Sequence, residues 1–148
     1  MEQSGKGGAV RVGMQRGVFG GVVAFLVSLL GPVAGMVAAV LVGMSLGRRA
    51  AAADAGRENG RPGALSGLVG GAVAAPVFVF GAAAGALVAA REAGAIMMSE
   101  TLSEMLGTRI APDQAWQLFL LSLVFAAVVQ AAILIGAATA SGAWEARD

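Results

Sequence analysis

Three long stretches without a charged side chain constrain this chain more than any other feature. They run from Gly17 to Gly47, from Ala64 to Ala90 and from Gln117 to Ala140, and together they fill more than half of the sequence. About 20 predominantly apolar residues suffice for a helix to cross roughly 30 Å of hydrocarbon, and a charge at mid-bilayer costs at least ~2.5 kcal/mol. The sequence therefore predicts an all-α polytopic integral membrane protein, a single membrane domain over residues 1–148 in contact with the lipid bilayer.

The composition excludes several classes of function. Hydrophobic residues make up 57% of the chain and charged residues 13%, against roughly 25% charged in an ordinary soluble domain. A net charge of +1 gives no reason to expect a nucleic acid partner. The sequence has no Cys and no His, which removes thiolate and imidazole metal ligands and the commonest general base. We therefore expect no catalytic residues, no metal and no cofactor, and predict that the protein is not an enzyme.

The first stretch, residues 17–47, is too long for one straight span. As a single helix it would measure about 46 Å at 1.5 Å per residue. Gly31 and Pro32 lie at its midpoint, and a proline inside a helix kinks or ends it. Two arrangements remain open: one tilted, kinked span, or a hairpin whose two arms, Val18 to Leu30 and Val33 to Leu46, enter and leave on one face of the membrane.

The distribution of basic residues favours the hairpin. Three precede the first stretch, four lie in the first linker, two lie in the second linker and one lies in the tail. A hairpin puts eight of them on one side of the membrane and two on the other, whereas three single crossings put five on each side. Because cytoplasmic segments carry the excess of Lys and Arg, we expect the hairpin, in a prokaryotic cytoplasmic (inner) membrane.

The second stretch, residues 64–90, carries small residues at helical spacing. Small side chains four residues apart let two membrane helices approach closely. Pro76 lies in the middle of this stretch, so we expect a second proline break and a bundle packed through Gly and Ala, a glycine zipper. The residues predicted to pack helices in this stretch are Gly63, Gly67, Gly71, Ala75, Gly81 and Gly85.

The order of these features resembles a group of proteins. Gly31-Pro-Val-Ala-Gly35, an Arg-containing linker and then Gly63-Ala-Leu-Ser-Gly-Leu-Val-Gly-Gly-Ala72 are similar to segments of small uncharacterised glycine-rich membrane proteins of prokaryotes. The resemblance covers residues 17–90 and rests on motifs of low complexity. It implies a helical membrane fold and no particular activity.

The second linker contains a predicted amphipathic helix over residues 95–107. Apolar residues recur there at helical spacing, acidic residues occupy other faces, and Gly107 supplies a stop. Interfacial membrane helices favour Lys and Arg, so we expect this acidic helix to contact another protein subunit. The apolar residues predicted to make the contact are Met98, Leu102, Met105 and Leu106.

The third stretch is predicted as a helix over residues 113–140. Trp116 and Trp144 bracket it, about 42 Å apart along a helix, as tryptophans at the two membrane interfaces do. Gln130 is its one strongly polar side chain. Such a side chain at membrane depth forms hydrogen bonds between helices, so we predict a helix-packing role for Gln130, with a place in a conduction path as the alternative.

Two classes of function are compatible with these sequence features. The first is a non-catalytic structural or assembly subunit of a larger membrane protein complex, either with other proteins or with further copies of the chain. The alternative is a homo-oligomeric pore or small transporter. Conduction requires rings of polar groups along the path, and the three stretches offer few polar side chains, among them Ser66, Ser122 and Gln130. The sequence therefore favours the structural subunit.

Overall fold

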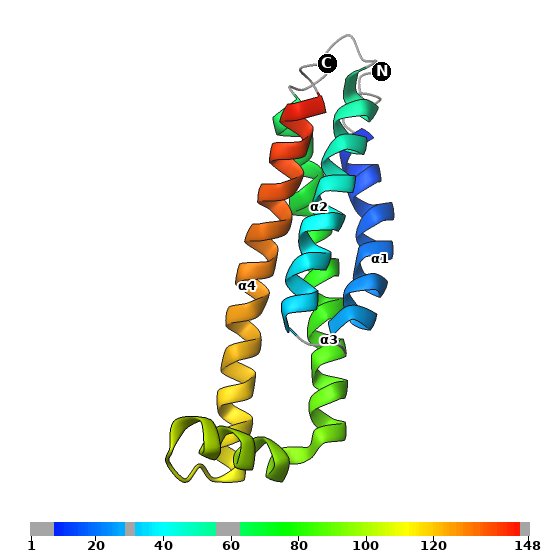
Figure 1. Ribbon diagram of the computed structural model, residues 1–148. Helices are drawn as coiled ribbons and strands as arrows, with labels where there is room; N and C mark the ends of the chain where they lie inside the picture. The colour runs from blue at the N-terminus through cyan, green and yellow to red at the C-terminus, as the bar shows by residue number, and fades with distance from the viewer. Residues whose placement is uncertain (1–7, 29–31, 56–62, 146–148) are drawn as a thin grey trace.

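The computed structural model describes residues 8–28, 32–55 and 63–145. Over these ranges the chain forms four helices: α1 (Gly8–Ser28), α2 (Pro32–Ala55), α3 (Gly63–Leu106) and α4 (Pro112–Glu145) (Figure 1). Each of the four is long and apolar enough to cross a membrane. The predicted class, an all-α polytopic membrane protein, is confirmed.

The first apolar stretch contains two helices that run in opposite directions, as in the hairpin alternative (Figure 1). Gly31, at the predicted break, lies outside the described residues, and Pro32 opens α2, where a missing backbone donor costs nothing. Both helices are longer than the predicted arms, because α1 begins at Gly8 and α2 continues to Ala55. At 21 and 24 residues they measure about 31 and 36 Å, so each can reach across a bilayer.

The break predicted at Pro76 is wrong. α3 continues through Pro76, and the non-helical dihedral angles inside it belong to Gly94, with φ 78° and ψ 153°. Pro76 is exposed, so its ring faces away from the neighbouring helices. Membrane helices tolerate proline because local adjustments and neighbouring groups satisfy the freed backbone carbonyl. The real interruption lies at a glycine, since this backbone conformation is open to glycine and to almost no other residue.

Beyond Gly94, α3 changes direction and crosses the lower end of the molecule (Figure 1). Residues 95–106, called here the terminal segment of α3, correspond to the amphipathic helix predicted over 95–107. The segment ends at Leu106, and Gly107 has a φ of 64°, the left-handed conformation common just after a helix. The Ser103 hydroxyl accepts a hydrogen bond of 3.0 Å from the backbone amide of Ile110, which ties the following turn back to the helix.

The four helices form two hairpins that lie side by side in the same orientation. α1 runs parallel to α3, and α2 runs parallel to α4 (Figure 1). α2 and α3 each contact the other three helices, whereas the described parts of α1 and α4 do not contact each other. The interior therefore lies around α2 and α3, where the side chains of Leu46, Phe78 and Leu134 are fully buried.

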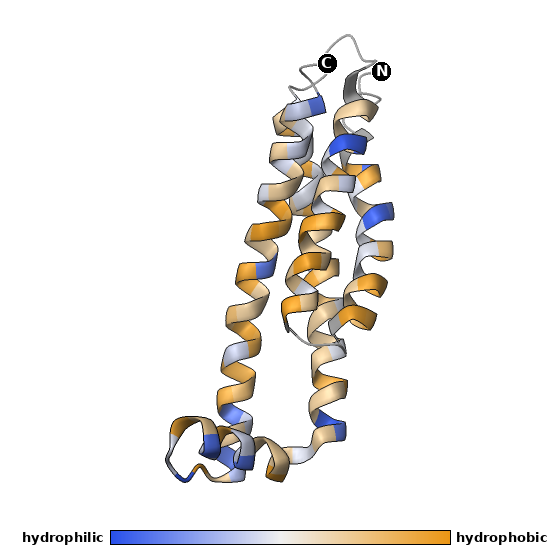
Figure 2. Ribbon diagram, in the orientation of Figure 1, coloured by the Kyte–Doolittle hydropathy of each residue, from blue (hydrophilic) through white to orange (hydrophobic). Residues whose placement is uncertain are grey.

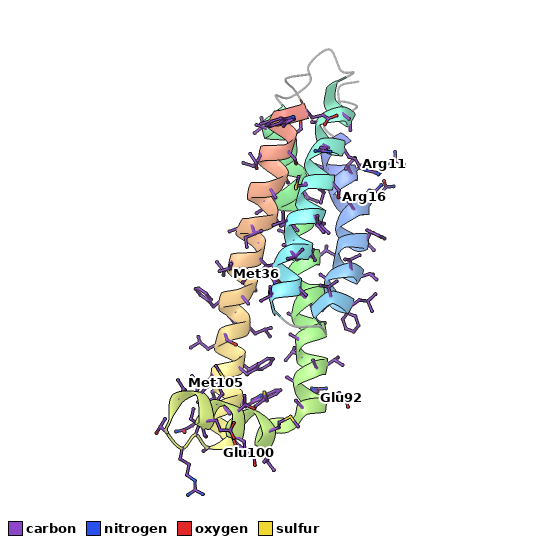
Figure 3. The ribbon with its side chains drawn as sticks, viewed as in Figure 1. Arg11, Arg16, Met36, Glu92, Glu100 and Met105 are labelled. Carbon is purple, nitrogen blue, oxygen red and sulfur yellow. The ribbon has the colours of Figure 1, made fainter. Side chains whose placement is uncertain are left out.

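The outer surface of the bundle is apolar along its length and hydrophilic at its ends (Figure 2). Large side chains such as those of Val18, Phe80 and Phe125 are exposed on it. Arg11 and Arg16 lie toward the upper end, and Glu92 and Glu100 lie at the lower end (Figure 3). An outward apolar surface of this extent fits contact with lipid.

Candidate functional site

The upper part of α3 packs against α4 through glycines. A Cβ atom added to Gly67 would meet the carbonyl oxygen of Ala138, and one added to Gly71 would lie 3.0 Å from the Ala138 Cβ atom. On the α4 side, a Cβ atom added to Gly142 would meet the Gly63 carbonyl. The two backbones are therefore in direct contact along this face, and a side chain on either glycine would separate them.

The lower glycines of α3 face a different helix. Cβ atoms added to Gly81 and Gly85 would meet the backbone carbonyls of Gly21 and Phe25 in α1. From Gly71 to Gly81 the helix makes about 2.8 turns at 3.6 residues per turn, so the two glycines point in different directions. The glycines predicted as helix-packing positions in α3 thus divide between two partners, with Gly63, Gly67 and Gly71 toward α4 and Gly81 and Gly85 toward α1. Ala75, also predicted as a packing position, is buried.

Three helices meet at Ala138. In α2, a Cβ atom on Gly43 would lie 2.6 Å from the Leu134 carbonyl oxygen, and one on Gly47 would meet the Ala138 carbonyl oxygen, which also faces Gly67. Ala138 is fully buried. Ala138 was not among the predicted packing residues, although Leu134, Ala138 and Gly142 fall four residues apart in α4. That spacing is the signal which could have located it.

Hydroxyl groups inside the helices bond to their own backbones. Ser122 donates to the Phe119 carbonyl at 2.7 Å, Thr139 donates to the Ile135 carbonyl at 2.8 Å, and Ser141 donates to the Ala138 carbonyl at 3.2 Å. Their hydrogens are therefore used within one turn of the same helix. These side chains are not arranged as donors along a path between helices.

Gln130 differs from the hydroxyl-bearing side chains of α4. It is only 6% exposed, yet within the described part of the chain it makes no hydrogen bond. The interhelical hydrogen bond expected for Gln130 is therefore not found among these residues. Its side chain instead lines a cavity between α3 and α4.

This α3–α4 cavity has a volume of about 380 Å³ and is partly open to the outside. It lies toward the lower end of the hairpin α1–α2, since the Phe25 backbone, near the end of α1, is level with Gly85 of α3. Met98 of the terminal segment and Phe119 of α4 also line it. Most of its wall consists of small side chains: Ala82, Ala83, Ala86, Ala89, Ala90, Ala126 and Ala127.

The four residues predicted to contact a partner do not share one surface. Met98 lines the α3–α4 cavity, and Leu102 lines a second hollow beside Leu118 of α4. Leu106 borders that second hollow and is nevertheless 61% exposed, and Met105 is 78% exposed. Half of the predicted contact surface is therefore turned toward the chain's own α4, and the other half faces outward.

The two tryptophans lie near opposite ends of α4. Trp116 is half-buried and stacks on Phe119 with ring centroids 5.5 Å apart, whereas Trp144 is exposed. Their role as interfacial anchors remains a prediction. The described residues hold no group of three or more His, Cys, Asp or Glu side chains arranged to bind a metal ion.

Comparisons of this chain with protein-family models, with curated proteins and with solved structures found no match.

Proposed function

We propose that this protein is a non-catalytic structural or assembly subunit of a larger membrane protein complex. The observation that carries the proposal is the set of exposed apolar side chains on the terminal segment of α3. This short helix lies at the hydrophilic end of the bundle (Figures 2 and 3), yet it exposes a series of large apolar side chains. Those side chains are Ile96 at 68%, Met97 at 59%, Met105 at 78% and Leu106 at 61% exposure.

The chemistry of this surface favours a protein partner. Glu100 and Glu104 are exposed on the same segment, and two carboxylates are unfavourable beside anionic lipid headgroups. Methionine side chains are flexible and polarisable, so they fit irregular protein surfaces well. An apolar surface with acidic neighbours suits a partner that offers a hydrophobic patch edged by Lys or Arg.

The interior supports a structural role over a conducting one. The centre of the described bundle is filled by fully buried apolar side chains, among them Phe78, Leu134 and Ala138. The hydroxyls of Ser122, Thr139 and Ser141 bond to their own helices. A pore requires polar groups along its wall to replace the hydration of the passing solute, and these side chains do not supply such a wall.

Photo-crosslinking in native membranes tests the proposal. A photoreactive amino acid in place of Met105 should give one crosslinked product with a different membrane protein, in fixed stoichiometry after gentle purification. The same amino acid in place of Leu121, which is exposed on α4, is the matched control and should react mainly with lipid. Crosslinks to further copies of this chain alone, together with ion or solute flux in liposomes, would support the pore or transporter instead.

A further inference from the structure

The α3–α4 cavity combines an apolar wall with the amide of Gln130, whose polar atoms open onto the cavity and make no hydrogen bond to the described residues. We propose that this cavity binds a neutral lipid-like molecule, one with an apolar chain and an uncharged hydrogen-bonding oxygen that is received by Gln130. The inference is independent of the proposed role as a subunit, because it rests on the lower part of the α3–α4 pair and not on the exposed surface of the terminal segment.

Gln130 supplies the polar group of the cavity. Its side-chain amide offers two donor hydrogens and one acceptor oxygen. Buried polar side chains in proteins are almost always hydrogen-bonded to protein or to ordered water. The Gln130 residue is only 6% exposed and its side chain makes no hydrogen bond to the described residues. No fully buried side-chain nitrogen or oxygen among those residues lacks a partner, so the Gln130 amide atoms open onto the cavity that the residue lines. Lipid tails cannot satisfy the amide. A ligand oxygen in the cavity can accept from its NH₂ group or donate to its carbonyl.

The size and shape of the cavity suit a small lipid-like molecule. A volume of about 380 Å³ falls within the range of about 300–1,000 Å³ that is typical of small-molecule sites. The lining runs from Val79 to Ala90 on α3 and from Phe119 to Gln130 on α4, which is about 16 Å of helix on each side. An elongated, partly open space of this kind suits an extended chain that enters sideways from the bilayer.

The absence of charge in the cavity wall favours a neutral ligand. None of the side chains that line the cavity is charged, so a carboxylate or phosphate group would be buried there without a counter-ion, which is strongly unfavourable. The Ser122 hydroxyl already donates to the Phe119 carbonyl, so Gln130 remains the available donor. The ligand oxygen is therefore a carbonyl or a hydroxyl. A diacylglycerol and an isoprenoid quinone share this chemistry, and the experiment distinguishes them.

Trp116 provides a reporter for occupancy. It stacks on Phe119, which lines the cavity, and the chain has only two tryptophans. In a Trp144→Phe protein in phosphatidylcholine nanodiscs, Trp116 fluorescence is titrated separately with a brominated diacylglycerol, with decylubiquinone and with brominated phosphatidylcholine. We expect saturable quenching by one of the first two probes and a linear, non-saturating response to the third.

Two cavity variants and two matched controls test the site. Gln130→Met keeps the length of the side chain and removes its hydrogen-bonding groups, and Ala86→Leu fills the cavity and leaves Gln130 in place. Both should raise the half-saturating probe concentration at least tenfold. Gln117→Leu and Ala132→Leu change exposed positions of α4 outside the cavity and should change that concentration by less than twofold. Circular dichroism and size-exclusion profiles identify any variant that has not folded.

Three results would overturn the proposal. The first is quenching by both neutral probes that rises linearly, as with brominated phosphatidylcholine. The second is equal half-saturation in folded Gln130→Met, Ala86→Leu and control proteins. The third is a dimer that Gln130→Met converts to a monomer, because a second copy of the chain would then occupy the cavity.

Discussion

The carbonyl oxygen of Ala138 in α4 occupies the space that a Cβ atom on Gly67 in α3 would need. The two helix backbones therefore touch directly, and the contact exists only because residue 67 has no side chain. Inside a bilayer the hydrophobic effect does not draw helices together, so close van der Waals contact must supply the attraction. At this level of the bundle, the separation of α3 and α4 thus depends on the absence of a side chain at residue 67.

We expect Gly67→Ala to destabilise the protein by about 1–3 kcal/mol, as overpacking of a close contact does. The backbone of Ala138 cannot rotate aside as the end of a flexible side chain could. Thermal unfolding in detergent, followed by circular dichroism, measures the change.

Gly136→Ala is the matched control for this substitution. Gly136 lies in α4, and nothing lies within 4 Å of a Cβ atom built on it. Alanine favours a helix over glycine by about 1 kcal/mol, so this variant should be neutral or more stable. Equal loss of stability in both variants would show that the close contact at Gly67 does not contribute specifically to the stability of the protein.

The two glycine faces of α3 contact different helices, so a substitution on one face should displace one neighbouring helix and leave the other in place. Gly81→Leu should push α1 away from α3, because the added side chain meets the Gly21 carbonyl, whereas the α3–α4 contact at Gly67 should persist. Distances between spin labels at Val18 and Phe80, which are exposed on α1 and α3, should lengthen and broaden. A label pair at Leu68 and Ala140, exposed on α3 and α4, should change little. Movement of both pairs together would mean that the bundle responds as one unit.

The fold class could be predicted from the sequence because hydropathy determines which solvent a segment can enter. The boundary of the first helix could not be predicted in the same way. Charge-free stretches place it after Arg16, but α1 already includes Arg11 and Arg16. A long arginine side chain can lie along apolar surface while its charged group reaches toward the interface.

Local sequence also failed to place the interruption of α3. Proline at position 76 and glycine at position 94 are both helix-breaking residues, and which of them interrupts the helix depends on the surroundings. Pro76 lies within the long apolar part of α3, where its helix neighbours stabilise the continuous form. Gly94 lies beyond Arg91 and Glu92, where the chain turns across the end of the bundle. The lack of an interhelical hydrogen bond at Gln130 could likewise not be predicted from the sequence, because it depends on a cavity formed by two helices.

The arrangement of two hairpins predicts a simple topology. The ends of α2 and α4 lie together at the upper end of the bundle, and the turn between α3 and α4 lies at the lower end (Figure 1). The sequence contains no cysteine, so single cysteines can be introduced without further change. Ala52→Cys and Glu145→Cys should react with an impermeant maleimide from one side of the membrane, and Thr108→Cys from the other. Labelling of Ala52→Cys and Glu145→Cys from opposite sides would rule out this arrangement.

A substitution at Gly94 should change stability through the backbone conformation and not through side-chain packing. Its φ of 78° and ψ of 153° lie in a region that is essentially restricted to glycine, and no atom lies within 4 Å of a Cβ atom built there. Gly94→Ala should therefore cost about 1–3 kcal/mol through backbone strain alone. The chain can relieve this strain by straightening α3 into one continuous helix, which would carry residues 95–106 away from α4.

The position of that segment can be measured through Met98, which lines the α3–α4 cavity beside Phe119. A Met98→Cys, Phe119→Cys protein should form a disulfide under mild oxidation when Gly94 is present. The same pair should form it much more slowly in the Gly94→Ala protein. If the disulfide forms equally fast in both, the turn at Gly94 is held by contacts beyond the glycine, and the hinge does not depend on its backbone freedom.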